Sequence, residues 1–165
     1  MEELRTDRLV LRELTLDDVD ALLEVLGDAE AMRHYPRPKS RGETAAWIEW
    51  SRGLYPQGLG LHGVVLASTG ELIGDCGLTY QDVEGTQEVE IGYHVNPRHW
   101  GRGYATEAAL RWRDYARDSL GLGRLVAIVA PDNLPSQAVA TKMGMSFERQ
   151  FVKNGLPMLL LSQSL

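Results

Sequence analysis

The chain has 165 residues, of which 44% are hydrophobic and 24% charged, and its formal net charge is -6 at pH 7. These values predict one soluble globular domain over residues 1–165, and the negative charge argues against a nucleic-acid partner. The sequence contains neither an apolar leader nor a run of membrane-spanning length, so we expect a cytoplasmic protein. Cys76 is the single cysteine, which excludes a disulfide framework and a thiolate metal cluster and predicts a buried thiol.

The N-terminal segment predicts a strand followed by a helix. Residues 8–13 form a short apolar run with charges at its two ends, as in a strand. Thr15 precedes Asp18 by three residues, which is the spacing of a capping box at the start of a helix. Residues 19–26 carry apolar side chains at helical spacing, and Gly27 is the expected end of this helix.

A second helix is predicted after a polar loop. The loop, at 34–39, contains two prolines. Ser40 and Glu43 then have the spacing of another capping box. Trp47 and Trp50 lie on the inner side of the helix that follows, and we expect both to be core residues rather than a platform for a ligand.

Three consecutive strands are predicted in the middle of the chain. Residues 61–67 and 72–80 form a hairpin around the turn residues 68–71. A second turn at 82–86 leads into residues 88–95, where apolar side chains alternate with a period of two. This strand is therefore expected to be half buried.

The C-terminal half alternates helix and strand before a closing hairpin. Residues 124–130 are continuously apolar, which predicts a central strand covered on both faces. The predicted elements are a helix at 105–120, the strand at 124–130, a short helix at 136–143, and two strands at 147–153 and 158–161 joined by an Asn-Gly turn. The whole order, seven strands and four helices, predicts an α+β layered domain with a mixed sheet.

A glycine loop separates the strand at 88–95 from the helix at 105–120. Gly101 and Gly103 let the backbone approach a ligand closely, and the first N–H groups of the following helix lack internal partners. With Arg102 they predict either a phosphate or pyrophosphate site or a glycine-rich turn that binds no ligand. A dinucleotide fingerprint would have a third glycine where Thr106 stands, and a nucleoside-triphosphate loop would end in Gly-Lys-Ser/Thr, so neither of these sites is favoured.

Four stretches together resemble one branch of the GNAT N-acetyltransferases, the branch similar to ribosomal-protein-alanine N-acetyltransferases. The strongest is Trp-Gly-Arg-Gly-Tyr-Ala-Thr-Glu-Ala, in which Trp100 stands where the family more often has Gln or Arg. The others are Thr-Asp-Arg-Leu-Val-Leu-Arg at 6–12, Glu-Ile-Gly-Tyr at 90–93, and the Asn133 to Ser136 spacing followed by Lys-x-Gly at 142–144. The resemblance covers almost the whole chain, in the family's order.

This resemblance implies the GNAT (acyl-CoA N-acyltransferase) fold, a mixed and mostly antiparallel sheet of seven strands flanked by four helices. It implies acetyl-CoA as cosubstrate, no metal, and direct attack of an amine on the thioester in a ternary complex. In the family, two parallel strands splay apart and the exposed edge, here at 93–95, pairs with the pantetheine through main-chain groups. The positions implied to bind acetyl-CoA are Tyr93, His94, Val95, Gly101, Arg102, Gly103, Tyr104, Ala105, Thr106, Asn133 and Ser136.

The attacking amine must lose a proton, and Glu90 is the candidate base because it precedes the expected splay and matches the family's Glu-Ile-Gly-Tyr position. By strand parity Glu88, Glu90 and His94 share one face. Glu88 is the alternative base, whereas no motif supplies His94 with a partner, so its side chain is not favoured as a base.

The departing thiolate also needs a proton or a hydrogen bond. Many family members use a tyrosine where this chain has Ala140, and the glutamate found on the preceding strand in some is replaced by Ile128. Ser136 occupies the position where this branch offers a hydroxyl to the thiol, so it is the second catalytic candidate, with helix N-cap as its alternative role. Asn133 either bonds the pantetheine or its strand, or serves as a turn asparagine, and Arg102 either contacts phosphate or is solvated.

The sequence indicates less about the acceptor amine than about the acetyl donor. The fold places it between the first two helices and the closing hairpin, so pocket candidates are His34, Tyr35, Trp47 and residues 151–157. The resemblance favours the N-terminal amine of a peptide or protein. A small-molecule amine acetyltransferase and a CoA-binding module without catalysis remain the alternatives, and a homodimer is left open.

Overall fold

The computed structural model describes residues 3–165. Its strands are β1 (Leu4–Arg5), β2 (Leu9–Arg12), β3 (Gly60–Leu66), β4 (Leu72–Val83), β5 (Thr86–Val95), β6 (Arg124–Val129), β7 (Ser146–Lys153) and β8 (Leu156–Ser164). The helices are α1 (Val19–Leu26), α2 (Arg41–Leu54), α3 (Tyr104–Asp118) and α4 (Leu134–Lys142), with short 3-10 turns at Leu16–Asp18, Tyr55–Gln57 and Pro97–His99. None of these helices is long and apolar enough to cross a membrane.

All eight strands form one mixed sheet in the order β1-β2-β3-β4-β5-β6-β8-β7. Neighbouring strands are antiparallel except β5 and β6, which are parallel. The sequence predicted seven strands. The eighth is β1, two residues that pair with β2 through Leu4 and Arg5, and so short a segment has no periodicity from which to predict it.

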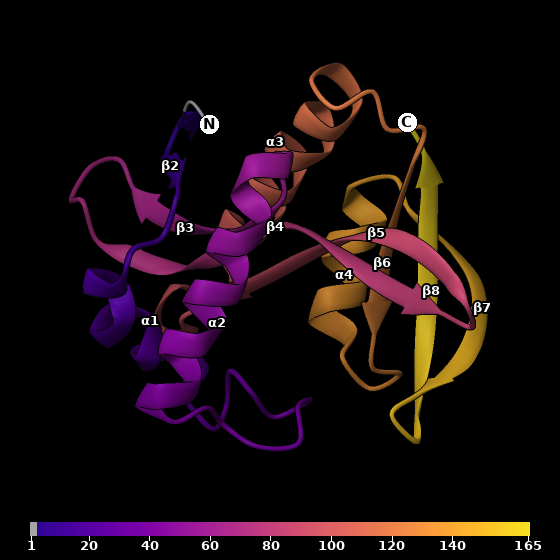
Figure 1. The fold of residues 1–165 in the computed structure, drawn as a ribbon, viewed down its shortest axis with the longest axis horizontal. Coiled ribbons are helices and arrows are strands. Elements are labelled where there is room, and N and C mark those ends of the chain that lie inside the picture. Colours follow the sequence, from indigo (N-terminus) through magenta and orange to yellow (C-terminus); the bar gives the residue numbers. More distant parts are fainter. Residues whose placement is uncertain (1–2) are drawn as a thin grey trace.

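The four helices cover the sheet from two sides. Figure 1 shows α1 and α2 in front of the sheet and α3 behind it, with β7 and β8 at the far right end. Trp112 of α3 is fully buried in the larger core cluster, together with Ile91 of β5. A second cluster contains Leu22 of α1 and Ile48 of α2. Side chains alternate along β5, so Ile91 faces α3 while Glu90 and its parity partners face the α1 and α2 side.

Most predicted helix starts and turns are confirmed. Both capping boxes form, at Thr15 with Asp18 and at Ser40 with Glu43. The turn after β7 has positive φ at Asn154, as an Asn-Gly hairpin turn requires. These features depend on residues at most three apart, which is why sequence spacing predicts them well.

Helix α4 and the tryptophans differ from the predictions. Helix α4 begins at Leu134, two residues before the predicted start, because the side chain of Asn133 caps it. Trp50 is 42% exposed, so the core assignment was wrong for this residue. Cys76 is fully buried, as predicted.

Candidate functional site

The parallel strands β5 and β6 diverge almost as soon as they meet. Within the described chain they pair only at Glu90 and Val126, although β5 continues to Val95 and β6 to Val129. Beyond that pair, residues 91–95 keep β4 on one edge and have no strand on the other. The main-chain groups along this edge, including those of the predicted positions Tyr93, His94 and Val95, are therefore available to an extended ligand.

The glycine loop, residues 100–103, connects the end of β5 to α3. The Trp100 indole N–H donates to the Val95 carbonyl at 2.7 Å, which holds the loop against the strand. Gly101 has φ +73° and a Cβ there would meet no atom within 4 Å, while Gly103 is the N-cap of α3 with φ +83°. No side chain caps this helix within the described residues. Its first N–H groups are thus free for an anion that approaches over the glycines.

Arg8 and Glu107 fasten the N-terminal segment to the glycine loop. The Arg8 guanidinium donates to the Arg102 carbonyl at 3.0 Å and lies 4.5 Å from the centre of the Tyr104 ring. It also forms an ion pair with Glu107 at 2.6 Å, and Glu107 accepts from the Thr6 hydroxyl at 2.5 Å. Burial raises the pKa of Glu107, but these hydrogen bonds outweigh it and lower the pKa below its ordinary value. The motif at residues 6–12 and the glycine loop with the start of α3 are therefore held together by direct contacts.

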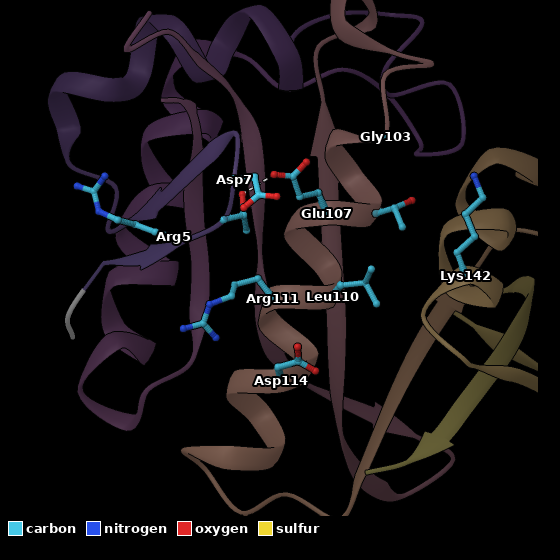
Figure 2. A pocket seen from close by; sticks show the side chains of 10 residues that line it. Arg5, Asp7, Gly103, Glu107, Leu110, Arg111, Asp114 and Lys142 are labelled. Carbon is cyan, nitrogen blue, oxygen red and sulfur yellow. Dashed lines mark hydrogen bonds between the residues drawn. The ribbon is translucent and has the colours of Figure 1, made fainter. Parts of the chain in front are cut away.

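The other predicted loop residues lie where the loop meets solvent. The Arg102 side chain is exposed and has no hydrogen-bond or ion-pair partner in the part of the chain that the structure describes. Tyr104, Ala105 and Thr106 form the first turn of α3. Beside this turn, a groove of about 560 Å³ runs along α3, and Lys142 of α4 lines its opposite side (Figure 2). An anion at the loop is therefore reachable from solvent.

Glu90 lies at the point where β5 and β6 separate. The backbone N–H of Ile128 and the side chain of Gln81 lie near its carboxyl group and favour its charged form. Ile128 belongs to the part of β6 that β5 no longer pairs. Burial raises the pKa of Glu90 to about 7, although the positive charge of Lys153 and these two polar groups act in the opposite direction. A carboxyl group with this pKa is suited to accept and release a proton near neutral pH.

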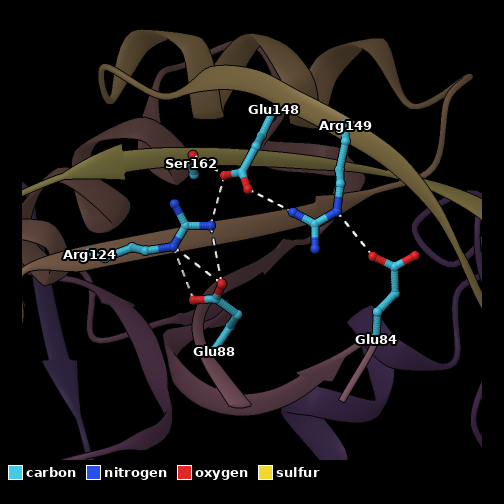
Figure 3. Close-up of polar contacts among 6 residues, drawn as sticks. All are labelled: Glu84, Glu88, Arg124, Glu148, Arg149 and Ser162. Carbon is cyan, nitrogen blue, oxygen red and sulfur yellow. Dashed lines mark hydrogen bonds and ion pairs between the residues drawn. The ribbon is translucent and has the colours of Figure 1, made fainter. Parts of the chain in front are cut away.

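Glu88, the alternative base, is engaged elsewhere. Both of its oxygens accept from Arg124, at 3.1 to 3.2 Å. Figure 3 shows Arg124 also bound to Glu148, within a network of charged groups at the β7 end of the sheet. A carboxylate held by a guanidinium is a weak proton acceptor. The arrangement favours Glu90 over Glu88.

Ser136 and Tyr93 form a hydroxyl pair across the splay. The Ser136 hydroxyl donates to the Tyr93 oxygen at 3.1 Å, and the Tyr93 O–H donates to the Ser136 carbonyl at 2.8 Å. Burial raises the pKa of Tyr93, so its phenol stays protonated. The N-cap alternative for Ser136 was wrong, because the cap is Asn133, whose side-chain oxygen accepts from the Ser136 N–H at 3.2 Å. Asn133 thus has a structural role at the start of α4.

The sequence reasoning missed a network on the α1 and α2 side of the sheet. His94 was not favoured because no motif supplied a partner, yet its ring bonds both Asp75 and Tyr35. Asp75 is fully buried, and the Trp47 indole N–H donates to its second oxygen at 2.8 Å. The signal in the sequence is the predicted turn at 82–86, because it joins two strands whose pairing places Asp75 opposite His94.

Comparisons with known proteins agree with one another over most of the chain. Residues 8–146 match the model of the acetyltransferase (GNAT) domain. The chain is 35% identical to YkkB and 34% identical to the uncharacterized N-acetyltransferase YoaA, both of Bacillus subtilis, over 94% and 93% of this chain and 91% and 90% of theirs. A solved acetyltransferase of Agrobacterium tumefaciens superposes with a TM-score of 0.84 at 29% identity, covering 99% of this chain and 94% of that one.

More distant structures share the fold alone. One is described as a RimL ribosomal L7/L12 alpha-N-protein acetyltransferase in complex with coenzyme A. It has a TM-score of 0.79 at 18% identity, with 99% of this chain and 98% of that one covered. The splayed strands, the glycine loop and α3 all fall within the shared region.

Proposed function

This chain belongs to the GNAT acetyltransferase family, and we propose that it transfers an acetyl group from acetyl-CoA to the N-terminal amine of a peptide or protein. The reaction class, N-acetyltransferase, follows from the family and its relatives. The observation that carries the proposal is the position of Glu90, which pairs with Val126 at the point where β5 and β6 separate.

The residues at the splay fit acetyl-CoA. The uncapped N-terminus of α3 and the open approach over Gly101 suit its diphosphate. The unpaired edge of β5 at residues 93–95 offers main-chain donors and acceptors to the pantetheine amides. The thioester would then lie in the splay, between Glu90 and the hydroxyl pair of Ser136 and Tyr93. Acetyl-CoA supplies the activated acetyl group there.

One proton transfer and one hydrogen bond are assigned to this chain's own residues. Glu90 takes a proton from the acceptor's ammonium group, directly or through one water, and so produces the free amine that attacks. Ser136 turns its hydroxyl to donate a hydrogen bond to the departing thiolate, which takes the second proton that the attacking nitrogen loses, while Tyr93 keeps its own proton. This pair takes the place of the motif tyrosine whose position is occupied by Ala140.

Two observations support a peptide acceptor. The four motifs match the branch similar to ribosomal-protein-alanine N-acetyltransferases, and structures of the same fold include the RimL protein described above. The net charge of -6 also favours cationic acceptors over anionic ones.

An acceptor panel tests the proposal. Thiol release from acetyl-CoA is followed with short peptides, the same peptides with blocked N-termini, and small amines such as polyamines and aminoglycosides. We expect free peptide N-termini to exceed both other groups at least about tenfold in kcat/KM, because the blocked peptides lack the reacting amine. Activity on small amines alone would instead identify a metabolite or antibiotic acetyltransferase. Binding of acetyl-CoA with no transfer to any amine would indicate a non-catalytic module.

A further inference from the structure

A continuous chain of hydrogen bonds leads from a buried carboxylate to an exposed aromatic side chain. Asp75 on β4 accepts from the Trp47 indole at 2.8 Å and contacts Nδ1 of His94 at 2.6 Å. Nε2 of His94 is 2.7 Å from the hydroxyl of Tyr35. Asp75 is fully buried, whereas Tyr35 is 43% exposed. We call Asp75, His94 and Tyr35 the acceptor-side network.

The loop that carries Tyr35 crosses the splay. Tyr35 bonds His94 on β5, and its neighbour His34 contacts Asp132 at 3.2 Å, just beyond the end of β6. Two adjacent residues of the α1–α2 loop therefore contact strand β5 and the turn that follows β6. This places the Tyr35 hydroxyl over the splay, on the face of β5 that also carries Glu90.

The floor between Glu90 and His94 is open. Gly92 lies between them on the same face of β5. Its φ is not positive, and a Cβ at this position would make only an ordinary contact of 3.5 Å with a Leu61 methyl group. Neither backbone conformation nor packing requires glycine here, and glycine within a strand often marks a place where a ligand approaches closely.

The charges around this floor suit an ammonium group. Although the Tyr35 side chain as a whole is 43% exposed, desolvation of its hydroxyl end beside His94 raises its pKa, and the nearby carboxylates of Glu90 and Asp75 raise it further. Tyr35 therefore keeps its proton, which it can share with His94 while a lone pair of its oxygen remains free to accept an N–H bond. The site would then offer two acceptors, the Glu90 carboxylate and the Tyr35 oxygen, to one cationic amine.

We propose that the acceptor-side network is the second polar wall of the amine site, with the acceptor's ammonium group over Gly92 between Glu90 and Tyr35. Tyr35 contacts the amine, while His94 and Asp75 are positioning residues that hold its hydroxyl in place. The chemical class is an unhindered primary ammonium with hydrogen bonds to both walls. This inference rests on the acetyl-transfer function proposed above.

The test separates acceptor binding from acetyl-CoA binding. Tyr35→Phe removes one hydroxyl and keeps the ring, and Tyr80→Phe makes the same change at an exposed tyrosine of β4 outside the network. With the best acceptor of the panel, we expect Tyr35→Phe to raise the acceptor KM about tenfold and to leave the acetyl-CoA KM within about twofold. Tyr80→Phe should behave as the parent. An unchanged acceptor KM in Tyr35→Phe, or an equal rise in both KM values, would overturn the proposal.

A second variant addresses the floor itself. Gly92→Leu fills the space above β5, and it should weaken acceptor binding more than Gly92→Ala does. Acceptor binding is measured by calorimetry on the CoA-loaded protein, so this readout does not require turnover. A parent that binds amines without acetylating them would refute the proposed function alone. Parent-like amine affinity in both Tyr35→Phe and Gly92→Leu would refute this inference alone.

Discussion

The pKa of Glu90 predicts how kcat/KM depends on pH. Its pKa of about 7 lies above the ordinary value of 4.5 because burial disfavours the charged form. As a base it must be deprotonated, so kcat/KM of the parent should rise as the pH increases through about 7 and level off above it. The measurement is a pH-rate profile of the full chain with the best acceptor.

Glu90→Gln should lower kcat/KM by about 100-fold or more and remove this acidic limb, with little change in acetyl-CoA affinity.

The same substitution should raise the free energy of unfolding at alkaline pH. The folded pKa exceeds the unfolded one, so the parent loses stability as the pH rises from about 4.5 to 7, and the variant does not. At pH 8 its free energy of unfolding should exceed the parent's by up to about 3 kcal/mol. Parent-like turnover would rule out Glu90 as the base.

His62 predicts acid sensitivity of the fold. It is almost fully buried between the rings of Tyr55 and Trp112, and its Nε2 has no hydrogen-bond partner within the described chain. Burial lowers its pKa to about 4. The unfolded chain therefore binds more protons between about pH 6.5 and 4, and stability falls as the pH decreases through this window, by up to about 3 kcal/mol.

His62→Phe replaces the titrating ring with an apolar one. Its free energy of unfolding, from denaturant titrations at pH 7 and pH 4.5, should fall less on acidification than the parent's does. The carboxylates that also titrate in this range are common to both proteins, so the difference between them isolates His62. Identical pH dependence would contradict the assignment.

At the scale of elements, the N-terminal segment and α3 act as one unit. Arg8 spans from the Arg102 carbonyl to Glu107, and a Cβ at Gly103 would lie 3.4 Å from its guanidinium. The N-terminal motif is thus positioned directly behind the loop that we expect to bind diphosphate. This arrangement brings together two motifs whose contacting residues lie 94 to 101 positions apart in the chain.

Arg8→Ala should raise the KM for acetyl-CoA about five- to tenfold and reduce the thermal stabilisation that CoA produces, since the loop backbone loses its support. The acceptor KM and the saturated kcat should change less than about twofold. Arg117→Ala is the matched control, because this arginine lies near the other end of α3 and, among the described residues, forms ion pairs with the neighbouring Asp114 and Asp118. Equal effects on both substrates would indicate a general loss of structure instead.

For the whole molecule, the decisive feature is how weakly its two halves of sheet are joined. Among the described residues, strands β1 to β5 and strands β6 to β8 are paired through one residue pair, Glu90 with Val126. The resulting splay leaves a backbone edge of β5 unpaired, and the α1–α2 loop reaches across it through His34 and Tyr35. The proposed donor site therefore lies along the edge of β5, and the proposed acceptor site lies on its α1 and α2 face.

The sequence alone determined the features that depend on neighbouring residues. Capping boxes, the Asn-Gly turn, the alternation along β5 and the glycine loop before α3 all follow from short spacings, because local hydrogen bonds and side-chain periodicity produce them. The motif resemblance, which orders these pieces along the chain, identified the family and the mixed sheet, and strand parity placed Glu90 on its face.

Only the tertiary structure decided which distant side chains meet. Arg124 forms an ion pair with Glu88, Tyr93 is hydrogen-bonded to Ser136, and Asp75 orients His94 toward Tyr35. These partners lie 19 to 59 residues apart, and periodicity reports which face a residue occupies but not what that face contacts. Local backbone chemistry thus predicted an anion site and the motif resemblance implied acetyl-CoA, whereas the proposed acceptor wall depends on the way the α1–α2 loop folds over the splayed strands.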